Sequence, residues 1–184
     1  MEDCKPIKTP MEVGQRNDTT TATAAEKNPN VPFQSLIGNL MYLVQGPRPD
    51  LAFVSHYLSQ FNLNHTLSHW GMAKGVLRYL KGTRNIGTTY TACKEPITAY
   101  TDASWNECGT GRSRSGYVFT MSMGAISWRS TRQQLIALST CEAEYIAFTE
   151  GLKEGKWIKT FMAELGFNSY GTQTLEVRCD NQNN

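Results

Sequence analysis

The stretch "STCEAEYIAFTEGLKEGKWIKTFMAELG" (residues 139–166) predicts one long amphipathic helix and decides the fold class of the chain. At about 100° per residue, Glu144 falls on its apolar face and Glu142 about 160° away, on the solvent side. Ser139 and Glu142 have the spacing of a capping box, which gives Glu142 a structural role. Glu144 is then a buried carboxylate that requires a cation, a metal or a substrate. The residues expected on its face are Ala147, Phe148, Gly151, Gly155, Ile158, Met162 and Leu165.

Strand-like runs flank this helix on both sides. Three runs precede it and one follows it, which gives the order strand, strand, strand, helix, strand. This order predicts an α/β fold with a mixed sheet: the first three strands antiparallel, the fourth parallel to the first, and the helix across one face. The four runs are "ITAYTDASW" (97–105), "RSGYVFTM" (114–121), "GAISWRS" (124–130) and "LEVRC" (175–179).

Three acidic residues fall at places where this fold would bring them together. Asp102 lies inside the first strand, where an aspartate is unfavourable by propensity and by desolvation, and Asp180 directly follows the last strand. If the first and last strands are neighbours, both converge with Glu144. Three carboxylates repel one another unless hard divalent cations such as Mg²⁺ neutralise them. The sequence therefore predicts a two-metal site, with ions about 4 Å apart, for phosphodiester hydrolysis.

The placement of basic residues indicates a polyanionic substrate. The net charge is only +2, so the preference must come from where the charges lie rather than from their sum. Two tracts without acidic residues would suit a nucleic-acid backbone, although a solvated helix face is the usual explanation for the first of them. The first tract carries Lys74, Arg78, Lys81 and Arg84, and the second carries Arg112, Arg114, Arg129 and Arg132.

The rest of the composition narrows the class of protein. Five cysteines without a CxxC pair argue against a disulfide framework or a structural zinc site, and favour a reducing compartment. The longest apolar run is far shorter than the roughly 20 residues of a membrane helix, and the polar N-terminus does not resemble a signal peptide. We expect residues 13–30 to be a linker and residues 32–82 to form three short helices.

Several motifs, in order, carry a family resemblance. The chain closely resembles the C-terminal part of copia-type retrotransposon Pol polyproteins, from the end of the reverse transcriptase through the ribonuclease H domain. The resemblance implies a reverse-transcriptase tail or linker (1–30), a helical connection segment (31–92) and a ribonuclease H-like domain (93–184). The motifs are "CKPIKTPME", "FQSLIGNLMYLVQGPRPDLAF", "HWGMAKGVLRYLKGT", "YTDASW", "RSRSGYVFTMSMGAISWRSTRQQLIALSTCEAEYIA" and "CDNQ".

The resemblance also implies an activity. Asp102, Glu144 and Asp180 would be catalytic acids that bind two Mg²⁺ ions, with Mn²⁺ as a substitute. Gln182 would contact the minor groove of an RNA–DNA hybrid, where the 2′-OH marks the RNA strand. The implied partners are this hybrid and the rest of the Pol polyprotein, with no membrane. The implied location is cytoplasmic, in the context of virus-like particles, or nuclear.

One difference from the family leaves two function classes open. Family members continue past "DNQ" to a fourth carboxylate, so we expect a domain truncated at its C-terminus with little hydrolytic activity of its own. The first class is a Mg²⁺-dependent nuclease that cuts RNA in hybrids. The second is a non-catalytic remnant that at most binds nucleic acid. No motif surrounds His56, His65 and His69, which we expect to be ordinary surface or packing residues, and Glu107 receives no role from the sequence.

Overall fold

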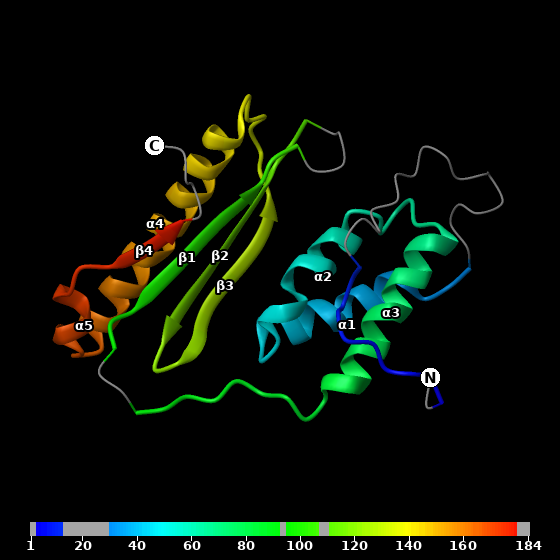
Figure 1. Ribbon diagram of the computed structural model, residues 1–184, viewed down its shortest axis with the longest axis horizontal. Helices are drawn as coiled ribbons and strands as arrows, with labels where there is room; N and C mark the ends of the chain where they lie inside the picture. Colours follow the sequence, from blue (N-terminus) through cyan, green and yellow to red (C-terminus); the bar gives the residue numbers. More distant parts are fainter. Residues whose placement is uncertain (1–2, 13–29, 93–94, 107–110, 180–184) are drawn as a thin grey trace. The chain divides into compact units, whose positions relative to one another are not determined.

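The computed structural model describes residues 3–12, 30–92, 95–106 and 111–179. The chain divides into two compact units, Met1–Gly87 and Thr88–Asn184. Figure 1 shows helices in the first unit and a sheet with a long helix in the second. The domain bounds inferred from the sequence stay a prediction.

The first unit is helical, as predicted. Its core is made of apolar side chains from all of its helices and includes Phe33, Leu51 and Val76, each fully buried. Pro49 stands in the first turn of a short 3₁₀ helix, where its missing N–H costs nothing. The elements are α1 (Phe33–Gln45), η3 (Pro49–Leu51), α2 (Ala52–Ser59) and α3 (Leu67–Thr83).

Histidine side chains serve the packing of this unit. His69 begins α3 with a reciprocal cap: its Nδ1 accepts the Thr66 N–H at 3.0 Å, while Thr66 Oγ1 accepts the His69 N–H at 3.4 Å. The His69 ring also stacks on Phe61, with centroids 3.9 Å apart. His65 stacks on Phe33 at 4.7 Å. His65 and His69 are therefore packing residues, as the sequence indicates.

A charged cluster joins the turn after α1 to the end of α3. Arg48 donates to Asp50 Oδ2 at 2.7 Å and to Thr83 Oγ1 at 2.7 Å, and the Tyr79 hydroxyl donates to Asp50 Oδ2 at 2.8 Å. Burial raises the pKa of Asp50, but hydrogen bonds from Arg48 and Tyr79 outweigh it, so this pKa lies below its ordinary value.

The second unit has the predicted mixed sheet. Its strand order is β3-β2-β1-β4, with antiparallel β1–β2 and β2–β3 pairs and a parallel β1–β4 pair. α4 runs along one face, and a short helix, α5, which the sequence did not predict, follows it (Figure 1). The bounds are β1 (Thr98–Ser104), β2 (Arg114–Met121), β3 (Gly124–Arg132), α4 (Thr140–Glu164), α5 (Asn168–Thr172) and β4 (Glu176–Cys179).

Two glycines allow α4 to lie close to the sheet. A Cβ on Gly151 would stand 2.6 Å from Cγ2 of Thr101 in β1, and a Cβ on Gly155 would overlap the side chain of Leu175. A side chain at either position would require Thr101, Leu175 or the helix itself to shift. Small residues thus fix the distance between α4 and β1.

The buried face of α4 differs in part from the predicted one. Gly151, Gly155 and Ile158 are buried as expected, but Glu144 is only half-buried and Leu165 is 55% exposed. The row of small residues reaches deepest, and this row starts at Ala143. The face is therefore turned away from Glu144, which lies at its border rather than at its centre.

The N-terminus of α4 is capped largely as predicted. Ser139 Oγ accepts the Glu142 N–H at 3.2 Å. The Glu142 carboxylate, however, accepts the N–H of Leu138 at 2.7 Å rather than that of Ser139. Glu142 therefore has the structural role that the sequence indicated, one residue further upstream.

We expect Asp50→Asn to lower the free energy of unfolding by about 1 kcal/mol at pH 7, a value reduced because the carboxylate is partly exposed. Because folding lowers this pKa, the stabilisation is full above about pH 4 and is lost as the pH falls through the lower folded value. Urea denaturation of both proteins at neutral and acidic pH measures the difference. The exposed Glu12→Gln is the control, and an equal difference at every pH would contradict the assignment.

A second expectation concerns the contact between helix and sheet. Gly151→Ala should destabilise the second unit by roughly 1–3 kcal/mol, because the methyl group meets Thr101. The control is Gly38→Ala in α1, where nothing lies within 4 Å of the added Cβ. That change should be neutral or stabilising by up to about 1 kcal/mol, through helix propensity. Thermal unfolding compares the two variants, and a stabilised Gly151→Ala protein would show that the close approach is not required.

Candidate functional site

Asp102 lies on the open face of the sheet. Along β1, Ala99 and Thr101 are buried beneath α4, whereas Tyr100 and Asp102 point to the other face and are exposed. Within this unit no described element covers that face, so the expected desolvation of Asp102 is wrong. Directly opposite Asp102 on β2 is Gly116, which has no side chain to fill the space beside the carboxylate.

Glu144 reaches the same strand from α4. Its Oε1 accepts the N–H of Ala103 at 3.2 Å. The described pairing of β1 with β4 ends at Thr101 and Cys179, so this N–H lies beyond the ladder between the two strands. Glu144 thus has a structural role that periodicity did not reveal. The bond also holds its carboxylate at the residue next to Asp102.

Two further side chains fix the start of α4, and the sequence pattern did not distinguish them. Gln133, 1% exposed, donates from Nε2 to Ser115 Oγ and to the Ala143 carbonyl, both at 2.9 Å. The Trp105 indole N–H donates to the Ala137 carbonyl at 3.1 Å. The Gln133 bonds connect the loop after β3 to β2 and to the first turn of α4, and the Trp105 bond connects the residue after β1 to the same loop. They therefore position Glu144.

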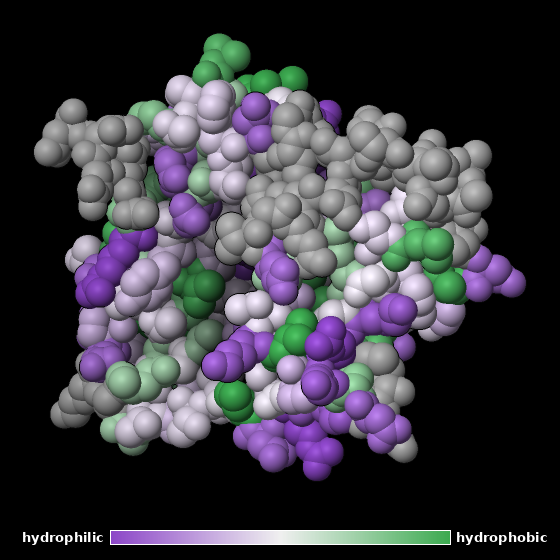
Figure 2. Space-filling view, turned by 45° about the vertical axis from the view of Figure 1, so that its right-hand side comes forward, coloured by the Kyte–Doolittle hydropathy of each residue, from purple (hydrophilic) through white to green (hydrophobic). Residues whose placement is uncertain are grey.

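The loop after β3 has an anchored side and an apolar, solvent-facing side. Its buried members are Gln133 and Ala137. Leu135, Ile136 and Leu138 are 68%, 60% and 84% exposed. Figure 2 shows hydrophobic side chains at the top of the view, the end at which this loop lies in Figure 1. The anchors account for the position of the loop, because its large apolar side chains contribute little burial.

The third predicted acid, Asp180, lies outside the described residues, as does Gln182. In sequence, Asp180 follows Cys179 as Asp102 follows Thr101, and Cys179 and Thr101 are paired. Within residues 3–12, 30–92, 95–106 and 111–179, no group of three His, Cys, Asp or Glu side chains could hold a metal ion. The described part of the candidate site is therefore the pair Asp102 and Glu144.

The arginines of the second tract lie in different environments. Arg112 and Arg129 are exposed and Arg132 is half-buried, but Arg114 is only 4% exposed and lies inside the fold. Burial does not favour the surface contact predicted for Arg114. Arg129 and Arg132 line a cleft of about 440 Å³ between β3 and α4, together with Lys153, Glu142 and Glu150. The charges of this cleft are mixed, so binding of nucleic acid by these arginines stays a prediction.

Half of the basic row on α3 already binds the chain itself. Arg78 Nε donates to the Lys5 carbonyl at 2.7 Å, and Lys81 Nζ donates to the Cys4 carbonyl at 3.0 Å. Lys74 and Arg84 are exposed. The predicted row therefore divides into two residues that hold the N-terminal segment and two that face solvent.

The described part of the chain contains no helix with both the length and the apolar character that a membrane span requires.

Comparison with known proteins gives relatives but no matching family model and no matching solved structure. The chain is 38% identical over 187 residues to the retrovirus-related Pol polyprotein from transposon TNT 1-94 of Nicotiana tabacum, which covers 99% of this chain. It is 32% identical over 184 residues to the corresponding polyprotein from transposon RE2 of Arabidopsis thaliana, which covers 98%. It is also 42% identical over 131 residues to the secreted RxLR effector protein 161 of Plasmopara viticola.

The relatives differ in how much of their own length the match covers. The chain spans 14% of the Nicotiana polyprotein and 12% of the Arabidopsis one. The match to the Plasmopara protein covers 70% of this chain and 92% of that protein. The near-complete coverage of this chain by the polyproteins identifies it as retrotransposon-derived. It belongs to the retrovirus-related Pol polyproteins of copia-type transposons.

Proposed function

We propose that the unit Thr88–Asn184 is a nuclease module that cuts the RNA strand of RNA–DNA hybrids during reverse transcription. The observation that supports this most directly is the bond from Ala103 N–H to Glu144 Oε1. It joins a carboxylate from α4 to the residue next to Asp102 on β1. A fold of this class and the Pol relatives add support, because a reverse-transcribing element must remove RNA from its hybrid.

The side chains present fit a hard divalent cation. Asp102 and Glu144 offer carboxylate oxygens, the donors that Mg²⁺ and Mn²⁺ accept. Asp102 is exposed, opposite a glycine, so an ion and a phosphate have access to it. Asp180, outside the described residues, is the proposed third ligand. Bound Mg²⁺ would supply positive charge that polarises a phosphate and activates water for attack.

The two described acids would make different contributions. Glu144 is held by a backbone N–H, so its carboxylate requires little reorganisation when it becomes a ligand. Asp102 is exposed on the open face, so it would hold an ion where a phosphate has access to it. For the hybrid, the exposed Arg112 and Arg129 are proposed phosphate contacts, and Gln182 a minor-groove contact.

One observation favours a second function, a non-catalytic remnant that at most binds nucleic acid. The Ala103 bond is reason enough for Glu144 to be present, since an unsatisfied strand N–H costs about 1–3 kcal/mol. A glutamate retained only for this bond would not need to bind a metal. The two functions therefore differ in whether the charge of Glu144 matters.

We expect the chain to cleave a labelled RNA–DNA hybrid weakly with Mg²⁺, and Glu144→Gln to abolish this cleavage without loss of stability, because the glutamine oxygen can still accept the Ala103 N–H. Asp102→Asn should do the same. Each should weaken Mn²⁺ binding at least about tenfold, given that loss of even an outer-shell partner costs about 10- to 100-fold. Glu142→Gln is the matched control, because a glutamine still caps α4.

Glu144→Ala separates the two roles of this side chain. It should lose both metal binding and about 1–3 kcal/mol of stability. If the wild-type chain neither cleaves the hybrid nor binds Mn²⁺, while Glu144→Ala is still destabilised, the remnant is the correct assignment. Cleavage that survives Asp102→Asn would remove the proposed site altogether.

Gln133 is expected to act on the same site from a distance. Gln133→Ala removes two buried hydrogen bonds and should destabilise the unit by roughly 2 kcal/mol. It should also weaken Mn²⁺ binding, because the first turn of α4 loses its anchor. Gln134→Ala, at the exposed neighbouring position, is the control. Calorimetric unfolding and Mn²⁺ titration test both effects, and unchanged Mn²⁺ affinity in a folded, destabilised variant would make Gln133 purely structural.

A further inference from the structure

The N-terminal segment is held along α3 by specific contacts. Beyond the two bonds from Arg78 and Lys81 to backbone carbonyls, Pro6 and Ile7 pack against glycines of the helix. A Cβ on Gly82 would stand 3.0 Å from Cβ of Pro6, and one on Gly75 would stand 3.9 Å from Cδ1 of Ile7. The segment therefore lies close to α3 at positions where glycine leaves room for it.

Gly82 lies in the last turn of α3, which ends at Thr83. Because Pro6 approaches this position closely, a side chain at Gly82 would press on the segment. The absence of a side chain here therefore leaves room for the segment.

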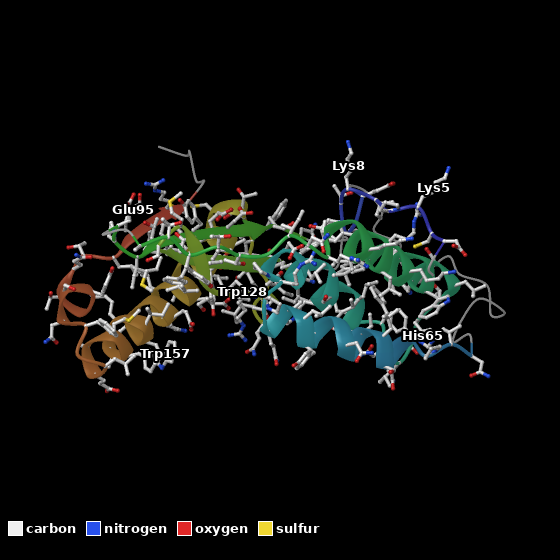
Figure 3. The ribbon with its side chains drawn as sticks, turned by 90° about the horizontal axis from the view of Figure 1, so that it is seen from below. Lys5, Lys8, His65, Glu95, Trp128 and Trp157 are labelled. Carbon is white, nitrogen blue, oxygen red and sulfur yellow. The ribbon has the colours of Figure 1, made fainter. Side chains whose placement is uncertain are left out.

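The segment carries its own cations to the surface. Lys5 and Lys8 are exposed, and Figure 3 shows both projecting to the same side, away from α3. Lys74 of α3 and Arg84, which follows the helix, are also exposed. The acidic side chains in the described part of this unit are Asp3, Glu12 and Asp50, and Asp50 is engaged by Arg48.

We infer that residues 4–8 form part of a phosphate-binding surface, in which Lys5 and Lys8 contact the nucleic-acid backbone. Arg78 and Lys81 are then positioning residues that hold the segment by its carbonyls, rather than phosphate contacts themselves. This rests on the proposed function for the identity of the polyanion, an RNA–DNA hybrid. It assigns to the segment a contact that the basic row on α3 was expected to make alone.

The chemistry of the contacts supports this division. Arg78 and Lys81 each use one of their donors on a carbonyl of the segment, so moving either side chain to reach a phosphate elsewhere would break the bond that holds the segment. The ammonium groups of Lys5 and Lys8 lie on the solvent side of the same segment. Lysine binds phosphate as a point charge on a flexible stem, which suits a contact that does not read sequence.

The first test measures binding of a labelled RNA–DNA hybrid by fluorescence anisotropy in EDTA, at several salt concentrations. Each phosphate contact contributes about 0.9 to the slope of log affinity against log salt. The double variant Lys5→Ala, Lys8→Ala should reduce this slope by about 1.8. A second double variant, Lys74→Ala, Arg84→Ala, is measured in the same way. The inference would be overturned if the slope kept its wild-type value in the Lys5, Lys8 variant and fell in the Lys74, Arg84 variant.

The second test displaces the segment without removing a charge. Gly82→Val places a side chain against Pro6, so it should reduce the slope as much as loss of both lysines and should speed amide exchange in residues 4–8. Gly71→Val on the same helix, where nothing lies within 4 Å, should change neither. An unchanged slope in a Gly82→Val protein with a released segment would show that the segment does not contact nucleic acid.

These outcomes are independent of the nuclease assignment, because binding in EDTA does not require the metal site. Loss of cleavage in Asp102→Asn with unchanged binding concerns the proposed function alone. A wild-type chain that binds anionic lipid vesicles but no hybrid would overturn the inference, since the same cations would then serve a membrane surface. Hybrid binding without any cleavage would leave it standing and favour the remnant.

Discussion

The second unit depends on the close contact between α4 and β1. Gly151 and Gly155 remove the side chains that would hold the helix away from Thr101 and Leu175. Because the helix lies this close, Glu144 in its second turn reaches the backbone of β1 directly. A helix one side-chain layer further out would leave Glu144 short of Ala103. The separation of two elements thus determines which atoms of the candidate site can meet.

Much of this arrangement follows from patterns of residues. Alternation in β1 correctly puts Tyr100 and Asp102 on one face, and chain order gives the parallel β4. Periodicity also separates the cap residue Glu142 from Glu144. These features are predictable because a strand or helix repeats its environment every two or 3.6 residues. The topology then follows from a few rules on how strands and helices connect.

Other features of the site depend on individual contacts that do not repeat along the chain. Periodicity cannot tell which of the two sheet faces is covered, so Asp102 was expected to be buried and is exposed. Gln133 and Gln134 are identical neighbours in the sequence, and only the first turns inward to bind Ser115 and the Ala143 carbonyl. The prediction for Asp180 stays a prediction, because this residue lies outside the described residues.

The cluster at the end of α3 has a consequence for how the sequence can diverge. Asp50 accepts from Arg48 and Tyr79, and Arg48 also donates to Thr83, so each polar group is the partner of another. Loss of one member leaves its partners with polar groups that are partly shielded from water. Copies of a mobile element accumulate substitutions independently. Among those copies whose helical unit still folds, Arg48, Asp50 and Tyr79 should therefore covary. Copies that keep the three residues together can then be distinguished from copies that no longer require this unit to fold.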